Sequence, residues 1–152
     1  MRVPAKIETT IKTNGQEMKG TFVMLKFLTA KKNPYDLVFG PSDEQGRIVV
    51  MRDQIIGEAR KTLELFLMDY GDLETEWTGK LRVTPMNRES IERALSALRL
   101  FGRVHEYPPG YEESLKAADA LLAQRGEADL IATVQCETEE PISVETTSVR
   151  AT

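Results

Sequence analysis

The segment 20–59 constrains the fold most strongly, because it holds the densest apolar runs of the chain together with its clearest turn chemistry. Within it, residues 21–28 have apolar side chains at nearly every position. This pattern predicts a strand that is buried on one face and largely covered on the other. We therefore expect this strand to lie in the middle of a sheet and not at its edge.

Two further strands and a helix are predicted in the same segment. Residues 36–39 and 47–51 are short apolar runs, and the cluster 40–46 between them combines Gly, Pro, Ser and Asp, which favour turns. The two runs are therefore predicted to form a β-hairpin. Asp53 is the expected N-cap of an amphipathic helix that extends to Phe66.

Several residues of the segment 20–51 have the spacing of a known type of β module. They are Gly20-x-x-Val23-x-Leu25 and Ser42-Asp43-x-x-Gly46-Arg47-Ile48. This spacing resembles the small β-sandwich modules of the transthyretin-like and carboxypeptidase-regulatory-like group. The resemblance implies a sandwich suited to binding or scaffolding.

The same broad group includes hydroxyisourate hydrolases, which use several histidines and a C-terminal Tyr-Arg-Gly-Ser. This chain has one histidine, His105, and its sequence ends in Ser148-Val149-Arg150-Ala151-Thr152. The enzymatic branch of the resemblance is therefore not expected.

The rest of the chain adds strands first and helices later. A one-sided strand is expected at 6–12, joined by Asn14-Gly15 in a hairpin to the strand that begins at Gly20. The remaining expected elements are a strand at 79–85, helices at 87–101 and 111–124, and a strand at 130–136. The predicted fold is α+β: an antiparallel β-sandwich-like sheet with one inserted helix and a C-terminal helical hairpin.

A chain of 152 residues fits one domain, which we place at 1–136. Residues 137–152 are rich in Glu, Thr and Ser, with few apolar side chains, and are predicted to form a flexible acidic tail. We expect no membrane segment, since no run approaches the ~20 apolar residues that a spanning helix needs. The N-terminus lacks the apolar run of a secretory signal, and the single cysteine, Cys136, agrees with a cytoplasmic location.

Charge is distributed unevenly along the chain, although the net charge is only −4. Residues 1–32 carry seven basic side chains against two acidic ones, and residues 127–152 carry six acidic ones against Arg150. One interpretation is a basic docking surface with an acidic tail. The other is that the two ends offset each other in the fold. The negative net charge argues against nucleic acid as a partner. A steep fall of affinity with salt would be the signature of such binding.

The most reactive cluster by composition is His105 and Glu106, followed by Tyr107 and Tyr111. An imidazole beside a carboxylate has the properties of a general acid or base. The alternative is a loop whose aromatic side chains stack on the helical hairpin.

An acidic loop at 69–77 has carboxylates that are suitable ligands for a divalent cation, but without EF-hand spacing. A solvated turn is the alternative. Trp77 is expected in the core. Cys136 is expected as a small buried apolar side chain and not as a thiolate nucleophile, since no basic neighbour in the sequence lowers its thiol pKa. No phosphate loop, dinucleotide fingerprint or zinc spacing is present, so no cofactor and no metal are predicted.

These observations predict a small non-enzymatic module that binds a partner protein or assembles with itself. Its expected binding residues are Tyr107, Tyr111, Lys26, Lys31 and Lys32. The alternative is a hydrolase, or an enzyme that binds a small ligand or metal, centred on His105, Glu106 and the loop 69–77.

Overall fold

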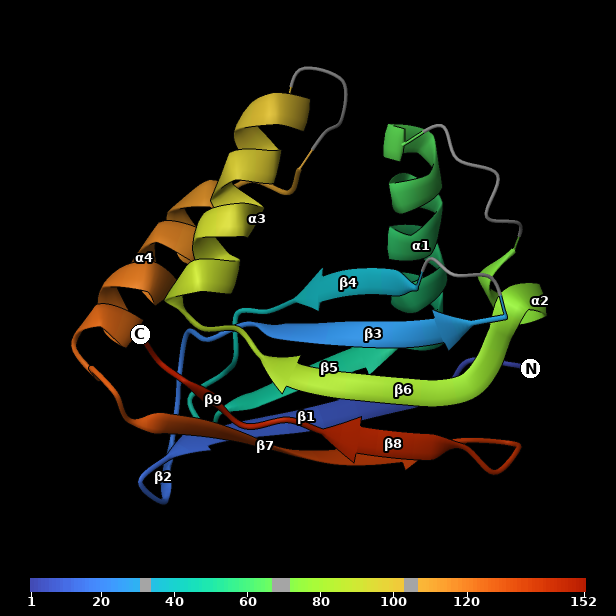
Figure 1. Ribbon diagram of the computed structural model, residues 1–152, viewed down its shortest axis with the longest axis horizontal. Helices are drawn as coiled ribbons and strands as arrows, with labels where there is room; N and C mark the ends of the chain where they lie inside the picture. The colour runs from blue at the N-terminus through green and yellow to red at the C-terminus, as the bar shows by residue number, and fades with distance from the viewer. Residues whose placement is uncertain (31–33, 67–71, 103–106) are drawn as a thin grey trace.

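The computed structural model describes residues 1–30, 34–66, 72–102 and 107–152, which form two open sheets and a group of helices (Figure 1). The strands are β1 (Lys6–Thr13), β2 (Gln16–Glu17), β3 (Val23–Thr29), β4 (Tyr35–Phe39), β5 (Arg47–Met51), β6 (Trp77–Pro85), β7 (Asp129–Glu137), β8 (Ser143–Thr146) and β9 (Val149–Arg150). The helices are α1 (Arg52–Phe66), α2 (Leu73–Glu76), α3 (Arg88–Phe101) and α4 (Tyr111–Ala123). The α+β class is confirmed.

The two sheets form a sandwich-like arrangement. One has the strand order β2-β1-β7-β9, with β5 also paired to β1, and the other has the order β4-β3-β6-β8. All pairs among the described strands are antiparallel except β6–β8, which is parallel. In Figure 1 the three longer helices lie on one side of the sheets, and α3 and α4 run antiparallel as the predicted hairpin.

Alternating side chains build the core between the sheets. Ile7, Thr9 and Ile11 of β1 are buried, as are Leu25 and Phe27 of β3, while the residues that alternate with them are more exposed. This is the period of two that puts one face of a strand inside. The predictions that β3 is a central strand and that Trp77 is buried are both confirmed.

The predicted hairpin between β1 and β3 is wrong, although its turn forms. Asn14 and Gly15 have φ of 50° and 76°, as a two-residue hairpin turn requires, and Thr13 pairs with Gln16. The returning strand is only the short β2, after which the chain crosses to the other sheet. Asn14 and Gly15 determine where the chain reverses direction, but they do not determine which later strand pairs with β1.

The predicted hairpin of 36–39 with 47–51 is also wrong, because β4 pairs with β3 and β5 pairs with β1 in the other sheet. The turn chemistry at Asp43 acts locally. Its carboxylate accepts hydrogen bonds from the backbone N–H groups of Gln45 and Arg47, both at 2.9 Å. This turn directs the chain into β5 without joining β5 to β4.

Residues 137–152 do not lie outside the domain, so the expected boundary at 136 is corrected. β8 pairs with β6 and β9 pairs with β7, which places this segment in both sheets. Ala151 is fully buried, and its backbone donates to Ala128 O and accepts from Arg88 N. Backbone pairing of exposed strands needs no apolar periodicity, which is why the sequence pattern missed β8 and β9.

Two details of the helices differ from the predictions. α1 begins at Arg52, so Asp53 lies inside the helix and is not its N-cap. At this end of the helix the side chain of Gln54 accepts a hydrogen bond from the backbone N–H of Met51 at 2.8 Å. A second short helix, α2, occupies part of the predicted acidic loop. At α3 the prediction holds, since the Asn87 side chain accepts from Ser90 N and Gly102 ends the helix.

The charges of the two ends offset each other in part. Glu139 lies 3.8 Å from the guanidinium of Arg2 and 2.9 Å from that of Arg52. Among the described residues, no helix is long and apolar enough to cross a membrane.

Candidate functional site

A tight turn precedes α4 and positions two tyrosines. The backbone N–H of Tyr111 donates to Pro108 O at 3.1 Å, and Gly110 has φ 80° and ψ 0°. These are the features of a type II turn with Pro109 and Gly110 at its centre, where glycine accepts the positive φ without a steric penalty. The turn folds the chain back so that Tyr107 lies over Tyr111.

The two tyrosine rings stack on each other. Their centroids are 5.4 Å apart and their planes differ by 12°, so the rings are stacked. Tyr111 also meets the buried ring of Phe22 edge to face at 6.3 Å. Through this second contact the stacked tyrosines pack against the core, and the core therefore fixes the orientation of the two rings.

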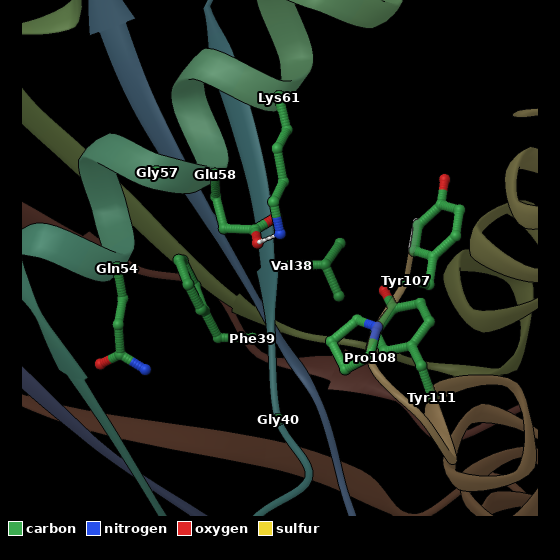
Figure 2. Close-up of a pocket in the computed structure, with 10 residues that line it drawn as sticks. All are labelled: Val38, Phe39, Gly40, Gln54, Gly57, Glu58, Lys61, Tyr107, Pro108 and Tyr111. Carbon is green, nitrogen blue, oxygen red and sulfur yellow. Dashed lines mark hydrogen bonds and ion pairs between the residues drawn. The ribbon is translucent and has the colours of Figure 1, made fainter. Parts of the chain in front are cut away.

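The tyrosines border a hollow that we name the aromatic groove. It has a main part of about 360 Å³ and a side part of about 140 Å³ that share both tyrosines. Figure 2 shows the main part, with α1 on one side, β4 between, and the tyrosines opposite. The residues of both parts are Asp36, Leu37, Val38, Phe39, Gly40, Gln54, Gly57, Glu58, Lys61, Thr62, Ala94, Ala97, Tyr107, Pro108 and Tyr111.

The floor of the aromatic groove is the free edge of a strand. Five consecutive residues, 36–40, contribute to it, although side chains of a strand alternate between its two faces. Leu37 contributes while its side chain is only 2% exposed. Consecutive residues of a strand point to opposite faces of the sheet, so a hollow that all of them line must follow the edge of the strand. β4 is the last strand of its sheet, and within the described chain residues 36–40 make no hydrogen bond beyond those with β3.

Helix α1 forms the opposite wall with a polar pair and a gap. Lys61 Nζ lies 3.1 Å from Glu58 Oε1, so this pair is largely neutral as a unit. Gly57 lies one position before Glu58, and a Cβ built there meets no atom within 4 Å. The absence of a side chain at Gly57 therefore leaves the wall open next to Val38 and Phe39.

The groove raises the pKa of both of its tyrosines. Burial, and then the nearby Glu58 carboxylate, raise the pKa of Tyr111 to about 12, and the same two causes raise the pKa of Tyr107. Burial also raises the pKa of Asp36, against the opposing charge of Lys26. The Tyr111 hydroxyl therefore stays neutral to a higher pH than a free tyrosine does, and a neutral hydroxyl can donate a hydrogen bond.

The structure brings together some of the predicted site residues and separates others. Tyr107 and Tyr111 share the groove, whereas Lys26 lines a different hollow on the outer face of its sheet. Lys31, Lys32, His105 and Glu106 lie outside the described residues, so the basic and catalytic predictions that rest on them stay predictions. The loop hypothesis for Tyr107 and Tyr111 agrees with their stacking.

In the described part of the predicted acidic loop, Glu74 holds the N-terminal segment in place. Residues 69–71 lie outside the described chain, but Glu74 of α2 accepts from Val3 N at 3.2 Å and lies 3.6 Å from the Arg2 guanidinium. In the described part of the chain, no group of His, Cys, Asp and Glu is arranged to hold a metal ion. Cys136 is half-buried among apolar side chains, and burial raises its thiol pKa, which disfavours a reactive thiolate.

Sequence reasoning missed the whole α1 wall, namely Gln54, Gly57, Glu58, Lys61 and Thr62. One signal was present. A glycine in the interior of an amphipathic helix costs stability and often marks a place where space is needed. Gly57 is such a glycine.

Comparison with known proteins adds no relative: no family model, no curated protein and no solved structure matches the chain. The resemblance to transthyretin-like modules therefore stays a prediction.

Proposed function

We propose that this protein is a non-enzymatic interaction module that binds an extended segment of a partner protein in the aromatic groove. One observation supports this most directly: residues 36–40 of a sheet-edge strand form the floor of a hollow with an aromatic wall. Extended peptides add to such edges through backbone hydrogen bonds, and pockets beside the edge select their side chains.

The bound segment would pair with the free edge of β4 as an additional strand. Its backbone would provide the hydrogen bonds, which are largely independent of sequence. On one side its side chains would face the stacked rings of Tyr107 and Tyr111, next to Pro108. This wall favours apolar side chains and proline, because flat aromatic surfaces pack well against both.

The charges of the groove add a polar rim. Glu58 and Lys61 pair with each other at 3.1 Å, so neither presents an isolated charge to the groove. The preferred segment is thus apolar at its centre and uncharged where it crosses α1. Cys136, a thiol with no second cysteine in the sequence, agrees with a role in a reducing compartment such as the cytoplasm.

The test is a comparative selection from a library of random short peptides. The protein is panned beside its Gly57→Leu variant, in which a leucine side chain occupies the open wall of the groove. Leucine is a strong helix former, so the variant should fold at least as stably. Arg60→Leu is the matched control, since Arg60 is exposed on the same helix and outside the groove.

We expect peptides that bind the protein and Arg60→Leu equally and bind Gly57→Leu at least tenfold more weakly. Peptides that bind all three proteins alike would contradict the proposal. So would a dimer, detected by light scattering, that only Gly57→Leu abolishes, because a second copy would then occupy the groove.

A further inference from the structure

A second hollow lies on the outer face of the sheet that contains β3 and β6, and we name it the basic pocket. Its volume is about 320 Å³, which is within the range of small-molecule sites. Strands, the start of α3 and the C-terminal segment all contribute to it. Its residues are Met24, Lys26, Arg82, Thr84, Pro85, Met86, Asn87, Glu89, Ser90, Arg93, Thr147 and Val149.

Two cations of the basic pocket lie directly opposite each other. Lys26 of β3 and Arg82 of β6 are partners in the strand register. Like charges at such positions destabilise a sheet. Asp36 of β4 lies 3.8 Å from Lys26, and Glu145 of β8 lies 3.3 Å from Arg82. A row of four charges thus crosses the sheet, with the two cations adjacent at its centre and each carboxylate on the outer side of its cation.

A third cation reaches the pocket from above the sheet. Arg93 lies on α3 and makes no ion pair with any described residue, although Glu89 is four positions before it on the same helix. Three elements of the fold therefore direct positive groups into one hollow. Within its lining, Glu89 is the sole acidic side chain; Asp36 and Glu145 pair with Lys26 and Arg82 from outside the lining, so Arg93 is the one cation of the pocket without an ion pair among the described residues.

Neutral hydrogen-bond donors complete the lining. The hydroxyl groups of Thr84 and Thr147 make no hydrogen bond with the described part of the protein. An oxyanion with several oxygens and a double negative charge matches three cations and two hydroxyls better than a carboxylate does, because a carboxylate has two oxygens and one charge.

We propose that the basic pocket binds a small phosphate-bearing ligand between Lys26, Arg82 and Arg93. The phosphate would lie against the two opposed cations of the sheet and reduce their mutual repulsion. The remaining volume would hold the organic part of a phosphate monoester. This site is separate from the aromatic groove, so it stands or falls independently of the function proposed above.

The test follows amide resonances of Thr84, Ser90 and Arg93 by NMR during titration with inorganic phosphate and with phenyl phosphate. Sodium chloride at equal ionic strength and acetate are the comparison anions. We expect saturable shifts with both phosphates and only small, non-saturating shifts with chloride and acetate. Tighter binding of phenyl phosphate would assign the pocket to a phosphate monoester, and equal affinities would assign it to free phosphate.

Three variants localise the binding. Arg93→Gln and Lys26→Met should each weaken phosphate binding roughly tenfold, as expected for one lost charge-assisted contact. Arg99→Gln is the matched control, because Arg99 is exposed on the same helix and outside the pocket. Asp36→Asn should strengthen binding, since it releases Lys26 from its flanking partner. Far-UV circular dichroism checks that each variant is folded.

Two outcomes would overturn the proposal. The first is a phosphate response no larger than that of chloride, or one that Arg93→Gln leaves unchanged. The second is tight binding of a single-stranded oligonucleotide or polyglutamate without saturable binding of either phosphate, which would make the pocket part of a surface for a macromolecular polyanion.

Discussion

The aromatic groove and the basic pocket are built on the same sheet but use different parts of it. The groove follows the edge of β4 along residues 36–40, which hydrogen-bond only to β3 within the described chain. The pocket lies on the outer face of β3 and β6, where alternate side chains project. α3 lies between them, with Ala94 and Ala97 at the groove and Arg93 at the pocket. The comparison teaches that the edge of a sheet can bind a peptide backbone with little preference for its sequence, whereas the face of a sheet can select a ligand by its charge. Four predictions test this difference.

The largest effect is expected for Gly40→Ala at the end of the groove floor. Gly40 has φ 152°, and an added Cβ would lie 2.6 Å from the Phe22 ring and 2.8 Å from Thr21 O. Since backbone must move, we expect a loss of about 2–4 kcal/mol in the free energy of unfolding. Urea denaturation measures it. A cost below about 1 kcal/mol would show that the groove floor is not held rigidly against the core.

The second prediction concerns alkaline pH. The pKa of Tyr111 is raised from 10.0 to about 12, so the unfolded chain loses this proton first as the pH rises. The contribution of Tyr111 to stability is thus complete below pH 10 and is lost between pH 10 and about 12. Two pH units correspond to roughly 2–3 kcal/mol.

Tyr111→Phe provides the control for this alkaline loss. The difference in unfolding free energy between the protein and Tyr111→Phe should change across that pH window and be constant below it. A near-ultraviolet titration should show one tyrosinate fewer at the highest pH in the variant. Parallel pH profiles for the two proteins would show that the groove does not bury this hydroxyl.

A smaller effect of opposite sign is expected for Gly57→Ala in the groove wall. The new methyl group meets no atom within 4 Å, and alanine is a better helix former, so the variant should be more stable by about 0.5–1 kcal/mol. Its affinity for a groove-binding peptide should fall at the same time. Thermal unfolding and peptide titration together measure this. A variant that gains stability and keeps full affinity would separate Gly57 from the binding surface.

The smallest effect is expected in the basic pocket. A double-mutant cycle of Lys26→Met and Arg82→Met should give an unfavourable coupling of a few tenths of a kcal/mol in low salt without phosphate. The coupling should shrink in high salt, because the two side chains are partly exposed. A favourable coupling would contradict the view that these cations repel each other.

The sequence predicts the elements better than their partners. The periodicity around Leu25 and Leu95 places β3 and α3 correctly, since burial of one face requires that pattern. It does not predict which strands pair. The turns at Asn14 and Asp43 form through local backbone geometry and local hydrogen bonds, and these do not determine which strand the following segment joins. Residues 143–146 join the sheet through backbone pairing and the Glu145–Arg82 ion pair, with all four side chains exposed, and so carry no apolar periodicity.

The same limit applies to the two sites. The aromatic turn at Tyr107 to Tyr111 can be recognised in the sequence, because its aromatic residues and turn-forming prolines are local. The free edge of β4 cannot, since it depends on where the sheet ends. The sequence predicts Lys26 as a binding residue but not its position opposite Arg82, because that position depends on strand register, which long-range pairing decides.

The most direct test of strand addition at β4 is amide hydrogen exchange of residues 36–40 with and without a selected peptide. An edge strand has amides that point away from its neighbour, and a paired peptide would protect them. The account predicts that exchange slows at alternate residues of this range on binding and that Gly57→Leu abolishes the effect. Exchange that slows elsewhere, while residues 36–40 are unchanged under saturating peptide, would contradict it.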